Sequence, residues 1–174
     1  MSNNARYDSK TKIFHWVSAG LIFTMWLLGQ SFDFLPDGDP IIIGASIHYV
    51  LGAVLMILLA FRLNWKLSKG TKLPAALPGL WGTLAKSAHM AQYALLIAVL
   101  LLGIFALWVH GYSIFNLIQV PEFDPGNEEL KETVTELHEL FANVLLGLSA
   151  AHALMGFWHH YVRKDDTLKR MLSE

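Results

Sequence analysis

The sequence contains no cysteine among its 174 residues. This absence excludes disulfide bonds, iron–sulfur clusters, thiolate zinc sites and catalysis by a cysteine nucleophile. Charge is also scarce, because 16% of the residues are Asp, Glu, Lys or Arg, whereas 54% are hydrophobic. With a mean hydropathy of +0.42, the chain is too apolar for an ordinary water-soluble domain. The composition therefore favours a membrane protein.

Long apolar runs account for this composition. They predict four transmembrane helices in a single domain covering residues 1–174, with spans at roughly 11–30, 41–63, 84–110 and 128–162. Each run is long enough to cross a bilayer core of about 30 Å. The intervening segments at 31–40, 64–86 and 110–129 contain proline and glycine and are predicted to be loops. The expected fold class is all-α, a four-transmembrane-helix bundle.

Lysine and arginine are almost missing from one side of this predicted bundle. Alternate loops place Lys131 alone, of thirteen such residues, on the side that carries acidic residues from Asp33 to Glu129. The other twelve flank the opposite ends of the spans, so they form no patch for nucleic acid. The positive-inside rule then places both termini in the cytoplasm. The polar tail from Arg163 onward is expected to be soluble, with Asp165 and Asp166 capping or solvating it.

The apolar spans contain histidines, although ionisable residues are rare in transmembrane segments. His138 and His152 are fourteen positions apart, a step that returns to within about 40° of the same helix face and climbs about 21 Å. Such residues in a span are costly to bury and usually functional. Two imidazoles on one stripe at two depths suit two stacked metal centres.

Depth and neighbouring side chains select partners for these two histidines. His48 is expected near the depth of His138, and either His15 or His89 near that of His152. A porphyrin beside a helix needs small residues on the same stripe. The residues four positions after each histidine are Ala19 for His15, Gly52 for His48, Ala142 for His138 and Gly156 for His152, but Tyr93 for His89, Ile114 for His110 and Arg163 for His159. The sequence therefore predicts the pairs His15–His152 and His48–His138, one for each haem.

Other interpretations of these histidines are hydrogen-bonded packing residues, zinc ligands, or a haem-free transporter or assembly protein. Zinc sites require three or four clustered ligands, whereas these histidines are predicted in pairs. A bis-histidine site fills both axial positions of iron, which points to electron transfer rather than oxygen activation.

Several short motifs identify a family. The sequence resembles prokaryotic cytochrome b561 in FHW at 14–16, IHYVLG at 47–52, LHE at 137–139 and HHYVRKDDTLKRM at 159–171. The resemblance implies a multi-pass protein of the bacterial inner membrane that holds two b-type haems on His15, His48, His138 and His152. It also implies superoxide oxidase activity, with electrons passing from periplasmic superoxide to ubiquinone near the cytoplasmic side. His159 and His89 would contact the quinone.

The electron donor has a second candidate. A superoxide anion would be attracted by a basic rim, whereas the periplasmic rim predicted here is acidic. A small periplasmic electron carrier therefore remains open as the donor. The alternative function is a membrane-anchor cytochrome b subunit that passes electrons between quinone and a partner protein and has no catalysis alone.

Overall fold

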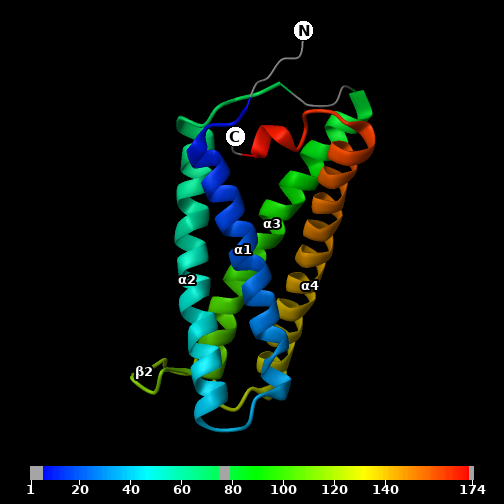
Figure 1. Ribbon diagram of the computed structural model, residues 1–174. Coiled ribbons are helices and arrows are strands. Elements are labelled where there is room, and N and C mark those ends of the chain that lie inside the picture. Colours follow the sequence, from blue (N-terminus) through cyan, green and yellow to red (C-terminus); the bar gives the residue numbers. More distant parts are fainter. Residues whose placement is uncertain (1–5, 75–78, 173–174) are drawn as a thin grey trace.

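The computed structural model describes residues 6–74 and 79–172, and this part of the chain forms four long helices that run side by side along one axis (Figure 1). These are α1 (Ser9–Gln30), α2 (Asp39–Ser68), α3 (Gly79–His110) and α4 (Glu128–Trp158). The shorter elements are η1 (Phe32–Phe34), β1 (Ser113–Ile114), β2 (Ile118–Gln119), η2 (His159–Arg163) and η3 (Lys169–Met171). All four long helices have the length and apolar composition of a membrane span. The predicted all-α transmembrane bundle is confirmed.

Capping side chains begin two of these helices. The Asp8 carboxylate accepts a hydrogen bond of 2.9 Å from the Thr11 backbone N–H at the start of α1. The Asn127 side chain accepts one of 3.0 Å from the Leu130 N–H at the start of α4. Such caps satisfy backbone donors that the helix itself leaves free. In α2, Pro40 occupies the first turn, where its missing N–H costs nothing.

The prediction of a loop over residues 64–86 was wrong at both of its ends. The α2 helix continues to Ser68 and α3 already begins at Gly79. The helical extension of α2 is held by contacts of its own, because the Trp65 indole N–H donates to Asp8 at 3.0 Å. Pro78, one of the residues on which the loop prediction rested, falls outside the described residues.

The predicted loop over residues 110–129 contains a short hairpin. Strands β1 and β2 pair in an antiparallel register with Ser113 opposite Gln119, and the hairpin projects sideways from the bundle (Figure 1). The Phe115 N–H donates to the Ser46 hydroxyl at 2.7 Å, which ties the turn to α2. Phe115 and Asn116 both have positive φ, 53° and 55°, as a tight hairpin turn demands.

The buried core is small and lies between α2, α3 and α4. Its main cluster contains Leu55, Leu59, Leu96, Leu100 and Leu145, with partly buried residues of α1 such as Ile22 packed against it. Many other large apolar side chains remain exposed along the helices, including Phe23, Ile57 and Leu101. An apolar outer surface of this kind is suited to lipid rather than water.

The two ends of the described chain meet at one end of the bundle. After a left-handed residue at Lys164 (φ 54°), the chain folds back across that end (red segment in Figure 1). The Tyr7 N–H donates to the Arg170 carbonyl at 3.1 Å, and the Trp16 indole N–H donates to the Met171 carbonyl at 3.0 Å. The tail expected to be soluble is therefore partly packed against the bundle, and Asp165 caps it by accepting a hydrogen bond of 3.0 Å from the Thr167 N–H, one of its two expected roles.

Candidate cofactor sites

Both predicted histidine pairs come together in the bundle. The ring centroids of His15 on α1 and His152 on α4 lie 6.2 Å apart, with an interplanar angle of 75°. Those of His48 on α2 and His138 on α4 also lie 6.2 Å apart, at 73°. We call His15–His152 the basic-end pair and His48–His138 the acidic-end pair. Each pair joins the α1–α2 half of the bundle to α4.

The spacing within each pair tests whether haem iron would fit. Two metal–imidazole bonds of about 2 Å on opposite faces of an iron, plus the ring radii, require a centroid separation of about 6 Å. Both pairs have this separation. Within residues 6–74 and 79–172, no three His, Asp or Glu side chains form a group that could hold a metal ion. The spacing of the two pairs therefore fits bis-histidine haem iron better than a tetrahedral zinc site.

A fourteen-residue step relates the two levels on every helix. At the acidic-end level stand Gly29, His48, Gly103 and His138, and fourteen positions away at the basic-end level stand His15, Arg62, His89 and His152. This step keeps a side chain on nearly the same face while moving it by about four turns. Midway on the same stripes lie Ile22, Leu55, Leu96 and Leu145, the last three of which are buried. An apolar layer thus separates the levels.

At the acidic-end level, glycines make room for the imidazoles. A Cβ built on Gly103 would lie 3.0 Å from His138 Cε1, and one on Gly29 would lie 3.8 Å from His48 Cε1. His138 Nδ1 lies 3.0 Å from the Val99 carbonyl oxygen. Because a carbonyl only accepts, Nδ1 donates and Nε2 keeps its lone pair for a metal. His48 Nδ1 is buried without a protein hydrogen-bond partner.

At the basic-end level, cationic and aromatic groups lie beside the histidines. The Arg62 guanidinium donates to His15 Nδ1 at 3.0 Å. Neutral His15 therefore carries its proton on Nε2 in this arrangement, and haem ligation through Nε2 would require that proton to move and this contact to open. The guanidinium carbon lies 5.3 Å from the Tyr93 ring centroid. The Lys66 ammonium lies 4.4 Å from the same ring. The sequence did not assign Arg62 to His15, although its position fourteen residues after His48 was a usable signal.

His89, a predicted quinone contact, lies against the basic-end pair. Its ring centroid is 5.0 Å from that of His152, closer than the separation that an intervening iron requires. His15 is therefore the better partner for His152 across a metal. Gln92, one turn after His89, approaches the Ser149 hydroxyl of α4 at 3.4 Å.

His159, the other predicted quinone contact, is buried, with 3% of its surface exposed. Its Nδ1 lies 2.6 Å from the Asp165 carboxylate. Burial of Asp165 opposes its ionisation, but hydrogen bonds from Thr167 and His159 outweigh this and hold its pKa well below the usual value. Sequence reasoning missed Asp165, because its contact depends on how the chain turns after α4.

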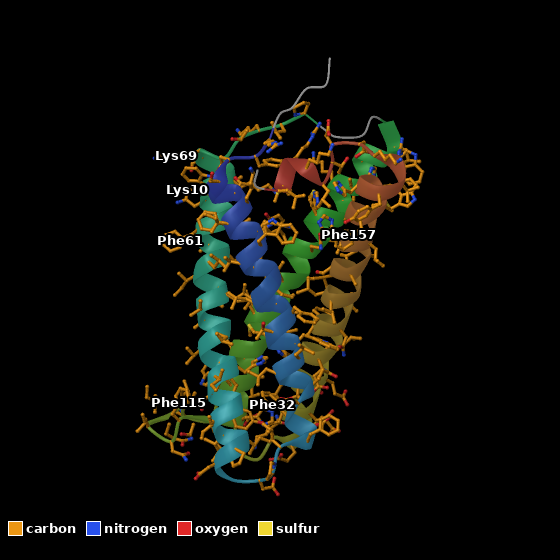
Figure 2. All side chains as sticks on the ribbon, viewed as in Figure 1. Lys10, Phe32, Phe61, Lys69, Phe115 and Phe157 are labelled. Carbon is orange, nitrogen blue, oxygen red and sulfur yellow. The ribbon has the colours of Figure 1, made fainter. Side chains whose placement is uncertain are left out.

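A surface groove of about 390 Å³ opens between α1 and α2 at the same end of the bundle. Figure 2 shows Lys10, Phe61 and Lys69 beside it. Its remaining lining residues are Ile13, Phe14, Asn64, Trp65 and Ser68. Neither His159 nor His89 lines this groove, which therefore does not correspond to the predicted quinone contacts.

The acidic end offers little positive charge to a donor. Lys131 lies 2.7 Å from the Glu122 carboxylate and 2.9 Å from that of Glu128. The lysine that is alone in the sequence on this side is thus paired with two carboxylates. Such pairing reduces the attraction that an approaching anion would feel.

Known proteins resemble the chain over almost its whole length. The family model described as prokaryotic cytochrome b561 matches residues 6–174. Cytochrome b561 homolog 2 of Escherichia coli is 31% identical over 97% of this chain and 92% of its own. The probable superoxide oxidase CybB of Yersinia pestis is 32% identical over 91% of this chain and 90% of its own. Together with the four apolar helices, these matches show a multi-pass electron-transfer protein of the bacterial inner membrane, and the chain belongs to the prokaryotic cytochrome b561 family.

Proposed function

We propose that the chain carries electrons from superoxide at its acidic end to ubiquinone at its basic end, through two b-type haems. The observation that carries this proposal is the pair of imidazole couples with the same 6.2 Å separation, fourteen residues apart along α4. A haem held by each couple would supply reversible one-electron iron chemistry. The acidic end then faces the periplasm, and both termini lie in the cytoplasm.

The chain's own residues would hold, orient and insulate these centres. His48 with His138 and His15 with His152 would be the axial ligands. The Val99 carbonyl would fix the His138 ring through Nδ1. The leucine layer of Leu55, Leu96 and Leu145 would exclude water between the two levels. His159 and His89 would contact the quinone at the basic end. In the overall reaction, two superoxide ions each lose one electron to become oxygen, and one ubiquinone gains two electrons and two protons.

The acidic end favours a second donor. Because Lys131 is paired with Glu122 and Glu128, a small periplasmic electron carrier with a basic surface would be attracted more strongly than an anion. With such a donor the chain would act as a membrane-anchor cytochrome between quinone and a partner protein. The relative named as a probable superoxide oxidase supports the first donor.

Stopped-flow mixing of the purified, haem-loaded protein with superoxide separates these functions. We expect superoxide to reduce the haems within the time course of the stopped-flow measurement. The haems should then be reoxidised only when ubiquinone is present. A protein whose haems are reduced slowly by superoxide, but rapidly by a basic electron carrier, would instead be the partner-linked cytochrome. A reduced-minus-oxidised spectrum without a b-type band would exclude both.

A further inference from the structure

The chain turns around the buried imidazole of His159 at the end of α4. After Trp158 the helix widens into the π turn η2. The His159 carbonyl there accepts from the backbone N–H of Lys164 and, at 3.2 Å, from that of Asp165. The left-handed residue Lys164 then reverses the chain. This turn brings the Asp165 carboxylate back over the ring that precedes it by six residues.

Asp165 and His159 are joined at two points. Besides the backbone bond, the Asp165 carboxylate lies 2.6 Å from His159 Nδ1. Because a carboxylate accepts hydrogen bonds, Nδ1 carries the proton and donates it in either protonation state of the ring. Nε2 is then the ring nitrogen left for another group. Arg163 lies at 4.0 Å from the same carboxylate oxygen, and its guanidinium lies over the Trp158 ring.

The segment after Asp165 is anchored on several parts of the bundle. The Leu168 side chain lies against Gly156, where an added Cβ would be 3.7 Å from Leu168 Cδ1. The Arg170 guanidinium donates to the Pro74 carbonyl at 2.9 Å, and Met171 accepts from Trp16. The Thr167 N–H donates to the second Asp165 oxygen at 3.0 Å. Hydrogen bonds to both of its oxygens therefore hold the Asp165 carboxylate in one position.

We propose that Asp165 is a positioning residue that holds His159 with Nε2 available to donate a proton to the quinone. This deepens the proposed function and rests on it. In the step, the Nε2–H bond of the protonated ring breaks, and an O–H bond forms at one carbonyl oxygen of the quinone as the two electrons arrive. The ring is left neutral, with its remaining proton on Nδ1 toward Asp165. Two protons taken up from the bulk solution at the basic end then reprotonate Nε2 and complete the second O–H bond of the quinol.

The neighbouring carboxylate provides a matched control. Asp166 pairs at 3.0 Å with Lys169 of its own segment, and no hydrogen bond or ion pair between it and His159 is found in the described part of the chain. We compare Asp165→Asn, Asp165→Glu and Asp166→Asn in the full-length, haem-loaded protein in lipid nanodiscs, with haem spectra recorded to verify the fold. The first measurement is the rate at which ubiquinone-1 oxidises the pre-reduced haems. The second is the ¹⁵N spectrum of histidine-labelled protein in the reduced, diamagnetic state, with the His159 signal assigned from a His159→Gln variant.

In the wild-type protein, neutral His159 is expected to carry its proton on Nδ1. Asp165→Asn should shift the ring toward the other tautomer and lower the saturated rate roughly 10- to 100-fold, as expected for loss of an oriented general acid. The half-saturating ubiquinone-1 concentration should change less than about twofold. Asp165→Glu should recover part of the rate, and Asp166→Asn should change neither readout.

A wild-type ring protonated on Nε2, or an Asp165→Asn rate equal to that of Asp166→Asn, overturns the proposal. Failure of the wild-type haems to react with ubiquinone-1 would overturn the proposed function and the proton-donor role together. The tautomer of His159 in Asp165→Asn still decides the positioning role by itself.

Discussion

The two histidine levels share a scaffold and differ in what surrounds it. At the acidic-end level, α1 and α3 present Gly29 and Gly103 to the imidazoles. At the basic-end level the corresponding step brings a guanidinium to His15 and a third imidazole to His152. A fixed cation beside a metal ligand stabilises the iron after it gains an electron. The comparison teaches that the bundle uses one helical repeat for two sites of different electrostatic character.

The largest effect is expected when one histidine pair is removed by substitution. His48→Ala should leave one haem per chain and keep the basic-end haem, because each pair binds independently. His152→Ala should do the reverse, and His89→Ala should keep both haems. Haem content measured as the pyridine haemochrome, together with a reduced-minus-oxidised spectrum, checks these outcomes. Loss of both haems, or of neither, in His48→Ala would show that the pairing is wrong.

Removing the cation tests the electrostatic difference itself. Arg62→Leu should lower the midpoint potential of one haem by on the order of 100 mV, the effect of a unit charge about 7 Å from iron at an effective dielectric constant of about 20. The other haem should keep its potential. Spectroelectrochemical titration of both haems measures this. Lys66→Leu is the control, since that ammonium lies on the Tyr93 ring and no contact of it with a paired histidine is found in the described chain; an equal shift there would argue against a specific role for Arg62.

A smaller change sharpens the role of the glycines. Gly103→Ala places a Cβ 3.0 Å from His138 Cε1, so the ring or α3 must shift by a few tenths of an ångström, at about 1–2 kcal/mol. The electron paramagnetic resonance signal of the acidic-end haem should move while that of the other stays. Gly20→Ala has no atom within 4 Å of the added Cβ and should change neither signal. An unaltered spectrum of the Gly103→Ala variant would mean that the close approach of Gly103 to His138 does not affect the acidic-end haem.

The smallest expected effect concerns the donor. The Lys131 ammonium holds the pKa of Glu122 below its usual value by hydrogen bonding, against the opposing effect of burial. The pair is therefore charged at neutral pH. Glu122→Gln removes one negative charge and should raise the rate of haem reduction by superoxide about twofold at low salt. The gain should vanish at high ionic strength. If the rate falls instead, the acidic end recognises something other than an anion.

The helices and the two pairs could be predicted because they depend on local pattern. Apolar length fixes a span, and a fourteen-residue step fixes a stripe. The small-residue rule selected the pairs for a reason that the contacts do not fully support. An added Cβ at Gly52 would lie 3.5 Å from Met25, and one at Gly156 would lie 3.7 Å from Leu168, so these glycines accommodate protein side chains. Gly29 and Gly103, which do approach the imidazoles, were not considered.

The partners of Arg62 and His159 could not be predicted from local pattern. Arg62 meets His15 across 47 positions of sequence, and Asp165 reaches His159 only through a π turn and a left-handed residue. A charged residue at the end of a span looks the same in sequence whether it sets topology or touches a ligand. Helical boundaries beyond the bilayer were missed for a related reason, because hydropathy does not record a helix that continues into water.

The leucine layer between the two levels has an energetic consequence for the cell. Leu55, Leu96 and Leu145 occupy the midway positions of their stripes with apolar side chains, so these three side chains offer no proton carrier between the two levels. In the proposed orientation, with the acidic end in the periplasm, an electron passing from the acidic end to the basic end would move inward against a cytoplasm that is electrically negative. Full transit would cost about 2.3 kcal/mol per 100 mV of membrane voltage. The turnover of this cytochrome should therefore slow in strongly energised membranes and quicken when the voltage collapses.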